Sequence, residues 1–484
     1  MANTIDGQAS PAVNRSRCPS GHRKKILKSR ARRAPFDSPT GESISPRTAR
    51  VNGTGAARQR THSLPVAPAS PAAVVRLAQP RLMIYSQDGL GLGHMRRTTS
   101  IATELIRVCP DSAVITLADS PLGNFFKTTP NHDYVKLPSI EKVRPGDWRA
   151  VNLPLGFDHV LGIRMQILRS VALNFRPDIL LVDHMPHGAM GELKPSLEAL
   201  RRAVPEAKLV LGLRDIIDAP DVVRHRWELE GAYQAMERFY DLVLVYGDQE
   251  VFDLGREYAL PEAVARKVRY CGYLCTPDLA RYPERIFAQY SRGRKAGTKL
   301  VVAMAGGGAD AYPMMRAVLD AMPAAQAKDR IALVLVTGPF MPAAERRDLE
   351  SRAARVRAVV RVTVSDPLSY VDAADLVIAR AGYNTTMEIL RSSTPALLIP
   401  RPGPSAEQLT RARLFRDRGW VDALLPDDLD TTSLAQAIGV GLHRGPSLAR
   451  SRPDLRGLPA AVEALLAPSS SPAHRNGRSL QASR

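Results

Sequence analysis

A glycine-rich turn followed directly by a histidine and two arginines is the first stretch whose residue types could do chemistry. It reads DGLGLGHMRR, from Asp88 to Arg97, and follows the apolar run RLMIYSQ. Glycines allow a ligand to approach the backbone closely. A histidine has an ordinary pKa of about 6.5 and so suits general-base work near neutral pH. We predict His94 as the catalytic base, with Asp88 either orienting it or serving as the base itself.

The turn does not fit the common nucleotide-binding fingerprints. The dinucleotide pattern G-x-G-x-x-G requires a glycine where His94 or Arg96 stands, and the G-K-[ST] of a Walker loop does not follow. These mismatches argue against a nicotinamide or flavin enzyme.

Two stretches in the second half also combine a strand end, a turn and a helix start. AMAGGGADAY (303–312) offers backbone N–H groups to an anion at the positive end of a helix, with tight packing and no ligand as the alternative. In RAGYNTTMEIL (380–390), Asn384 and the two threonines are candidate helix caps, and Glu388 is expected on the first turn. A carboxylate there could accept hydroxyl protons from a ribose or a sugar. Alternatively, it only favours its helix N-terminus.

The elements that position these stretches alternate along the chain. From Arg81 onward, apolar runs alternate with helix-like segments, and several runs are apolar on both faces, which predicts a parallel, doubly wound α/β fold. A basic stretch interrupts this rhythm, which then restarts, so we predict two facing Rossmann-like domains with disordered basic tails. The expected division is a tail at 1–79, an N-terminal domain at 80–275, a linker at 276–298, a C-terminal domain at 299–445, a helical segment at 446–466 and a tail at 467–484.

The net charge of +19 is concentrated at the two ends of the chain. Residues 1–80 carry 14 lysines and arginines against three acids, and residues 467–484 carry three arginines and no acid, which leaves +5 for the remainder. Segments of this composition cannot bury enough apolar surface to order themselves. They are either passive tails or contacts to anionic lipid or nucleic acid. Aromatic residues form only 5% of the chain, so we expect no stacking platform for nucleic acid.

Neither a membrane span nor a metal site is predicted. No apolar run reaches about 18 residues, no signal-peptide core is present, and the four cysteines form no C-x-x-C pair, so a cytoplasmic protein is expected. Asp428-Leu-Asp430 has the letters of a metal-binding D-x-D, but Asp430 fits a helix cap better. His184 and His187 could be metal ligands, but no third ligand is evident, and they fit a binding surface of the N-terminal domain better.

These stretches resemble a known family. Residues 81–442, above all AGGG, AGYNTTMEIL, TPALLIPRP and EQ, resemble GT-B glycosyltransferases with a family 28 C-terminal domain, typified by the bacterial transferase that adds GlcNAc during peptidoglycan synthesis. In that family the C-terminal half binds the nucleotide-sugar. The resemblance implies that Gly306–Gly308 meet the diphosphate, that Glu388 binds the ribose, and that Gln408, with Glu407 nearby, contacts the sugar.

The expected site is a larger set of residues drawn from both halves. The donor side comprises Gly306, Gly307, Gly308, Ala309, Arg380, Gly382, Asn384, Thr385, Glu388, Glu407 and Gln408. The acceptor side comprises Gly91, Gly93, Arg96, Arg97, Asp183, His184, His187, Glu192, Arg214 and Asp215. The family loop carries a hydroxyl residue after its paired glycines, where this chain has Gly308 and Ala309, so one contact to phosphate is in doubt. The N-terminal half matches little beyond its glycine turn, so the acceptor cannot be carried over.

The resulting expectation is a glycosyltransferase that moves a hexose-type sugar from a nucleotide donor to an acceptor hydroxyl. By resemblance the donor is UDP-linked, transfer inverts the anomeric centre, and neither metal nor cofactor is needed. By analogy the acceptor is lipid-linked, which implies peripheral contact with the inner face of the cell membrane. One alternative is a UDP-sugar hydrolase of the same fold, since such enzymes share a G-x-G-H-x-x-R turn that Arg97 satisfies. The other is a non-catalytic, basic-tailed protein that binds envelope polymers.

Overall fold

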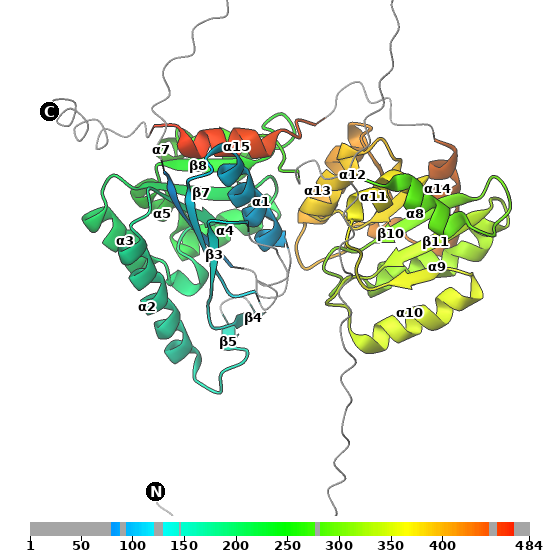
Figure 1. Ribbon diagram of the computed structural model, residues 1–484, viewed down its shortest axis with the longest axis horizontal. Coiled ribbons are helices and arrows are strands. Elements are labelled where there is room, and N and C mark those ends of the chain that lie inside the picture. Colours follow the sequence, from blue (N-terminus) through cyan, green and yellow to red (C-terminus); the bar gives the residue numbers. More distant parts are fainter. Residues whose placement is uncertain are drawn as a thin grey trace, which may run out of the picture. The chain divides into compact units, whose positions relative to one another are not determined.

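The structure is a computed structural model that describes residues 79–87, 93–120, 129–144, 147–275, 281–444 and 453–468. Asp88 and Gly91 lie outside these ranges, as do residues 1–78 and 469–484, on which almost all of the expectation of disordered tails falls. The described residues belong to one compact unit, which contains two parallel sheets and a small antiparallel hairpin (Figure 1).

The N-terminal sheet has seven strands in the order β3-β2-β1-β6-β7-β8-β9, and every neighbouring pair is parallel. Its strands are β1 (Arg81–Ser86), β2 (Ala113–Ala118), β3 (His132–Lys136), β6 (Ile179–Asp183), β7 (Lys208–Arg214), β8 (Leu242–Tyr246) and β9 (Val268–Tyr270). The hairpin is β4 (Ile140–Arg144) and β5 (Asp147–Ala150). The helices are α1 (Gly93–Val108), α2 (Phe157–Phe175), η2 (Ala189–Gly191), α3 (Lys194–Ala203), α4 (Pro220–Glu230), α5 (Ala232–Phe239), α6 (Leu254–Glu257) and α7 (Glu262–Ala265).

The C-terminal sheet has six strands in the order β12-β11-β10-β13-β14-β15, again all parallel. They are β10 (Lys299–Met304), β11 (Ile331–Val336), β12 (Val359–Arg361), β13 (Leu376–Ala379), β14 (Ala396–Leu398) and β15 (Asp422–Ala423). The helices are α8 (Pro283–Ser291), α9 (Tyr312–Gln326), α10 (Ala343–Arg355), α11 (Pro367–Ala373), α12 (Tyr383–Arg391), α13 (Glu407–Asp417), η3 (Pro426–Asp428), α14 (Thr431–His443) and α15 (Gly457–Leu466).

Both sheets are covered by helices on each face, as the apolar runs predicted. In β1, Leu82 and Ile84 pack with α1 and α15, whereas Met83 and its neighbour Tyr85 pack with α2 and α3. In β10 the odd-numbered residues pack against α9 and α14, and the even-numbered ones face the other core. The doubly wound α/β fold class is therefore confirmed.

In each sheet the strand order reverses next to the strand that comes first in the sequence. This switch lies between β1 and β6 in the N-terminal sheet and between β10 and β13 in the C-terminal sheet. Ligands of open α/β sheets bind at such switch points, beyond the carboxyl ends of the strands. Helix α1, which carries His94 on its first turn, follows β1, and the triple-glycine loop follows β10, so His94 and this loop each lie at the switch of their own sheet.

The structure differs from the sequence expectation at four places. Strand β3 and the β4–β5 hairpin were not predicted, because HDYVK and IEKVR mix charged with apolar residues and lack a continuous buried run. The segment 223–240, one of the helix-like segments of the sequence, is split into α4 and α5 at Gly231, whose φ of 66° lies in the left-handed region. The stretch 276–298, expected as a linker, contains helix α8.

Helix α15 packs on the N-terminal domain although it follows the C-terminal one in sequence. It contacts α1 and β8 (Figure 1). The Nζ of Lys208 donates to the carbonyl oxygens of Ala464 and Ala467 at 2.7 and 2.8 Å. This side chain thereby satisfies carbonyls that the helix end leaves without an internal partner.

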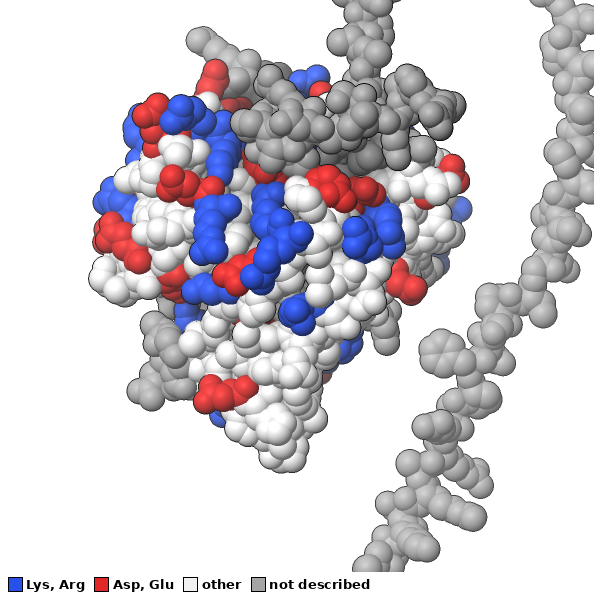
Figure 2. Space-filling view, turned by 90° about the vertical axis from the view of Figure 1, so that its left-hand side faces the viewer, with Lys and Arg blue, Asp and Glu red and all other residues white. Residues whose placement is uncertain are grey.

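The surface of the N-terminal domain carries both charged and apolar regions. Figure 2 shows one face on which lysines and arginines lie among aspartates and glutamates, while the lower tip is almost without charge. Four large apolar residues are exposed on β4 and on the segment after β5, namely Val143, Val151, Leu153 and Leu155. None of the described helices combines the length and the hydrophobicity of a membrane span.

Candidate active site

His94 lies on the first turn of α1 and is held by a buried carboxylate at the end of β6. Its Nδ1 is 2.5 Å from Oδ2 of Asp183, which is fully buried. Arg97 donates to the same carboxylate, from Nη2 at 2.8 Å and from Nε at 3.3 Å. Burial alone would raise the pKa of Asp183, but Arg97 and then His94 outweigh it and hold that pKa well below its ordinary value. Asp183 is therefore an anion that orients the imidazole.

The two predicted histidines after Asp183 differ in their surroundings. His184 has a φ of 77°, which is rare for a residue with a side chain, and its ring centroid is 5.4 Å from that of His94. Burial, then Arg214 and His94, lower the pKa of His184, and its Nδ1 is buried without a hydrogen-bond partner among the described residues. His187 instead approaches the last carbonyl of α4 at 3.3 Å and meets Phe239 edge-on. Strained residues cluster at functional sites, so His184 is the better candidate of the two histidines for the acceptor side.

Two acids expected on the acceptor side are buried and bound inside the protein. Glu192 is fully buried, accepts the hydroxyl of Tyr85 at 2.6 Å and binds Arg164 at 2.6 Å. Asp215 is 2% exposed and binds Arg411 of the C-terminal domain at 2.6 Å. Both carboxylates are therefore held by arginines inside the protein, and their acceptor-side assignment stays a prediction.

The loop between β10 and α9 keeps a row of backbone N–H groups unpaired. Gly306 and Gly308 have φ values of 59° and 88°. A Cβ on Gly308 would stand 2.0 Å from the carbonyl oxygen of Thr337, so only glycine fits there. Gly306 and Ala309 are exposed. Among the hydrogen bonds of the described part of the chain, none is donated by the backbone N–H groups of 306–310. Such a row of donors can bind an anion.

Two arginines flank this loop. Arg380, which follows β13, donates from Nη2 to the carbonyl oxygen of Asp310 at 2.6 Å, and Arg401, which follows β14, binds the Asp310 carboxylate at 3.2 Å. Both Nε atoms are buried and have no partner within the described residues. Burial lowers the pKa of Arg380, Asp310 opposes this, and Arg401 adds to it. An anion beside the loop would stabilise both guanidinium groups.

Helix α12 connects the glycine loop to the turn before His94. Its N-cap residue is Gly382 and no side chain caps it, so the predicted capping by Asn384 and the threonines is wrong. Asn384 instead donates from Nδ2 to the carbonyl oxygen of Gly93 at 3.0 Å. The next residue, Thr385, has its Oγ1 3.4 Å from where a Cβ on the first glycine of the loop would stand. Consecutive residues of one helix therefore lie next to both glycine-rich stretches.

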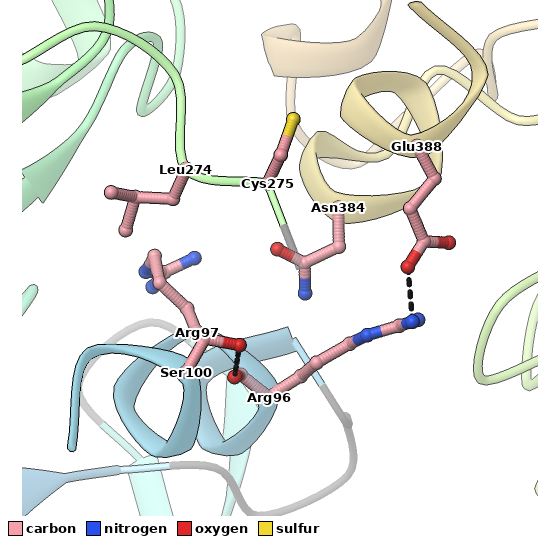
Figure 3. Close-up of a pocket in the computed structure, with 7 residues that line it drawn as sticks. All are labelled: Arg96, Arg97, Ser100, Leu274, Cys275, Asn384 and Glu388. Atoms are coloured by element: carbon pink, nitrogen blue, oxygen red, sulfur yellow. Dashed lines mark hydrogen bonds and ion pairs between the residues drawn. The ribbon is translucent and has the colours of Figure 1, made fainter. Parts of the chain in front are cut away.

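Glu388 lies on the second turn of α12 rather than on its first, and its carboxylate forms an ion pair with Arg96 of α1 (Figure 3). The Glu388 side chain is 5% exposed and that of Arg96 is 30% exposed. A small pocket at this contact is lined by Arg96, Arg97, Ser100, Leu274, Cys275, Asn384 and Glu388 (Figure 3). The acid expected to bind ribose thus holds a cation of the N-terminal domain in this structure.

Glu407 and Gln408 begin α13, as predicted. Oε2 of Glu407 is 2.5 Å from Nη1 of Arg214 at the end of β7. Burial would raise the pKa of Glu407, but Arg214 and then Arg411 lower it. Oε1 of Gln408 accepts the backbone N–H of Arg401 at 3.3 Å. Glu407 is therefore ionised and tied to the N-terminal domain, while Gln408 supports the backbone beside the glycine loop.

Sequence reasoning missed three parts of this arrangement. The turn Thr337–Gly338 packs against the glycine loop, since a Cβ on Gly338 would stand 2.5 Å from the carbonyl oxygen of Gly307. This turn and Arg401 both follow apolar strands, so their position at the carboxyl edge of a parallel sheet was a usable signal. Arg411 gave no signal, because its partner Asp215 belongs to another domain, 196 positions away.

The aspartates that imitate a metal motif have a structural role. Asp430 accepts the backbone N–H groups of Thr432 and Ser433 and so caps α14, as predicted. Across the described ranges, no group of three or more His, Cys, Asp or Glu residues is placed to hold a metal ion.

Parts of the chain are similar to a known family and to known proteins. Residues 301–457 match the glycosyltransferase family 28 C-terminal domain. A UDP-N-acetylglucosamine--N-acetylmuramyl-(pentapeptide) pyrophosphoryl-undecaprenol N-acetylglucosamine transferase from Geobacillus kaustophilus is 39% identical over 67 residues, covering 13% of this chain and 19% of that protein. The protein of the same name from Bacillus subtilis is 28% identical over 141 residues, covering 29% of this chain and 39% of that protein. The chain thus matches less than half the length of these relatives.

Solved structures extend the likeness of fold to both domains. The crystal structure of Acinetobacter baumannii MurG has a TM-score of 0.50 at 13% identity and covers 80% of this chain and 99% of that chain. At this identity the likeness concerns the fold alone. Residues 301–457 form a glycosyltransferase family 28 C-terminal domain within a GT-B fold, and the chain resembles the GT-B glycosyltransferases of that type, as its sequence motifs predicted.

Proposed function

We propose that the protein is a glycosyltransferase that moves a hexose-type sugar from a UDP-type donor to an acceptor hydroxyl, with inversion and without a metal ion. One observation carries this proposal. Of two consecutive residues of α12, Asn384 binds Gly93, directly before an oriented histidine, and Thr385 lies beside a loop whose backbone donors have no partner among the described residues. A general base and a leaving-group site are the two requirements of inverting sugar transfer, and the family 28 domain supports the choice of substrate.

The diphosphate of the donor would rest on the N–H groups of 306–309, beside Arg380 and Arg401. Backbone donors and guanidinium groups stabilise the charge that develops on the departing diphosphate, so no metal ion is required for that role. The Nε atoms of both arginines, which have no partner in the described part of the chain, support this assignment. Thr385, whose hydroxyl is beside the first glycine, offers a side-chain donor that the loop itself lacks.

The ribose of the donor would bind Glu388, and the transferred sugar would lie near Glu407 and Gln408. Glu388 binds Arg96 in this structure, so ribose hydroxyls must take the place of that guanidinium. Binding of the donor would therefore loosen one contact between the two domains.

Proton transfer is assigned to His94. A proton on Nδ1, shared with the ionised Asp183, leaves Nε2 as the basic nitrogen of the ring. The acceptor oxygen attacks the anomeric carbon, the bond from that carbon to the phosphate oxygen breaks, and the nucleoside diphosphate leaves with the electron pair. The proton of the acceptor hydroxyl passes to Nε2. Asp183 orients the ring and stabilises the imidazolium, as the buried acid of a catalytic triad does.

A donor panel tests this function. Purified protein is incubated with UDP-GlcNAc, UDP-glucose, UDP-galactose and GDP-mannose, with and without a lipid extract as acceptor source, and release of nucleoside diphosphate is followed. If the protein transfers sugar, nucleoside diphosphate should be released from a UDP-linked donor, and this release should depend on the extract. Steady release without acceptor would favour the UDP-sugar hydrolase, and absence of any nucleotide affinity in calorimetry would favour the polymer-binding protein.

The acceptor is proposed to be lipid-linked, reached by peripheral contact with the inner face of the cell membrane from a cytoplasmic position. The exposed apolar residues Val143, Val151, Leu153 and Leu155 support this contact. The double variant Leu153→Ser/Leu155→Ser is expected to lose most binding to vesicles of phosphatidylglycerol and phosphatidylethanolamine in co-sedimentation while keeping its affinity for UDP. Equal sedimentation of variant and wild type would contradict this part of the proposal.

A further inference from the structure

A buried ion pair joins the two domains beside the site, and the mechanism above does not use it. Arg411, on α13, donates from Nε to Oδ2 of Asp215 at 3.0 Å and from Nη2 to Oδ1 at 2.6 Å. Arg411 is fully buried and Asp215 is 2% exposed. Asp215 directly follows β7 of the N-terminal sheet, so a two-pronged contact ties one strand end to a helix of the other domain.

Stability alone is a weak explanation for this pair. Two charges taken out of water lose their hydration, and replacement of both partners by apolar groups is often neutral or stabilising. An ion pair is directional, however, and fixes the angle and register of the groups that it joins. The pair lies between two domains, where it can fix the angle and register of one domain against the other, which apolar packing would not do.

Arg411 also holds the segment that leads into α12. Its Nη1 donates to the carbonyl oxygen of Ala381 at 2.8 Å, and its guanidinium lies 5.7 Å from the ring centroid of Tyr383. The guanidinium of Arg97, which binds Asp183, is also 5.7 Å from that ring. Tyr383 therefore contacts the arginine of the histidine cluster as well as Arg411.

The ring of Tyr383 is itself fixed by the N-terminal domain. Its hydroxyl accepts the backbone N–H of Leu274 at 2.9 Å, and its side chain is almost fully buried. Asn384 and Thr385, which contact the histidine turn and the glycine loop, follow it directly. The position of these two residues thus depends on contacts that Arg411 makes.

We propose that Arg411, anchored on Asp215, is a positioning residue that fixes residues 381–385 and thereby keeps the diphosphate loop aligned with His94. The proposal rests on the proposed glycosyl transfer. Arg411 acts through Tyr383 and the α12 segment and does not touch substrate.

The matched variants are Arg411→Lys and Arg164→Lys. Arg164 is also fully buried and binds Glu192 through two nitrogens, but that pair lies within the N-terminal domain. Each lysine keeps the charge and loses the paired geometry. At a temperature where both variants are folded, Arg411→Lys should lower kcat for the donor identified by the panel at least tenfold, with a Kd for UDP within threefold of wild type. Arg164→Lys should leave kcat within threefold. Equal losses of kcat in both variants, or none in Arg411→Lys, would overturn the proposal.

A double variant separates positioning from stability if Arg411→Lys does not fold. Asp215→Leu/Arg411→Met removes both charges, so its melting temperature should lie above that of either single variant. Its kcat should remain at least tenfold below wild type, with binding of UDP retained. Recovery of kcat together with the melting temperature would show that the pair only stabilises the fold. Wild-type protein that neither binds UDP nor turns over any donor would instead refute the proposed function, and this inference with it.

Discussion

The carboxyl edges of the two parallel sheets, which meet in the candidate site, are built in opposite ways. At the edge of the N-terminal sheet, His94, Asp183 and Arg97 bind one another, and the acid is fully buried. At the edge of the C-terminal sheet, the backbone donors of 306–310 and the Nε atoms of two arginines have no partner among the described residues. The histidine of the first edge is thus held in place by protein side chains, whereas the donors of the second edge are available to a ligand.

This difference separates the two tasks of the proposed reaction. A general base must be held in one orientation before the substrate arrives, and contacts among protein side chains supply that. A diphosphate brings its own charge, so its site needs donors that are not already used by the protein. Variants at the first edge should therefore change turnover, and variants at the second should change donor affinity.

The largest effect is expected from His94→Ala. Loss of a positioned base should lower turnover by about 10²–10⁴-fold, while the Kd for UDP should remain within threefold of wild type. His225, an exposed histidine on α4, supplies the control His225→Ala, which should keep full turnover. Turnover and calorimetry with UDP check both expectations. Unchanged turnover in His94→Ala would remove this residue from the mechanism and leave the first edge without its assigned task.

The next largest effect is expected from Gly308→Ala, which tests the second edge. The added Cβ would stand 2.0 Å from the carbonyl oxygen of Thr337, at a φ of 88° that alanine rarely adopts. The loop must shift, and the Kd for UDP should rise at least about thirtyfold, the equivalent of one charge-assisted hydrogen bond. Gly439→Ala in α14, where a Cβ meets nothing within 4 Å, is the matched control in the same domain. Equal affinities of the two variants would show that no ligand rests on this loop.

A smaller loss of affinity is expected from Arg380→Met. Its guanidinium should contribute one charge-assisted contact to the diphosphate, so the Kd for UDP should rise about tenfold. Uridine has no phosphate, and its affinity should not change. Calorimetry with both ligands therefore separates a phosphate contact from a general distortion, and parallel losses for UDP and uridine would rule out the phosphate contact.

The sequence predicted the elements of each edge but not the contacts between them. All the apolar runs predicted as strands form strands, and His94 and the triple-glycine loop lie at switch points, because local pattern and parallel topology determine these features. The enclosure of Asp215 and Glu192 could not be predicted, because nothing in the neighbouring residues shows that an arginine from another element binds each carboxylate. Asn384 likewise suits a helix cap by type, yet it binds the turn of the other domain.

The smallest expected effect concerns the ion pair between Glu388 and Arg96, which does not fit the contrast between the two edges. Glu388 belongs to the donor side, yet it is engaged by Arg96 of α1, so ribose must compete with a guanidinium. Arg96→Met removes the competitor and should tighten binding of UDP about threefold, in keeping with the modest strength of ion pairs that are partly exposed. The gain should shrink at high salt, because salt screens the pair in the wild type.

The matched control for that experiment is Arg107→Met, on the same helix, which removes an exposed partner of Glu104 and should leave the affinity for UDP unchanged. The sign of the effect in Arg96→Met decides the role of this arginine. Tighter binding means that Arg96 competes with the ribose and that donor arrival loosens the contact between α1 and α12. Weaker binding would mean that the guanidinium itself contacts the donor. In that case the N-terminal edge would take part in donor binding, and the division between an edge for proton transfer and an edge for the diphosphate would no longer hold.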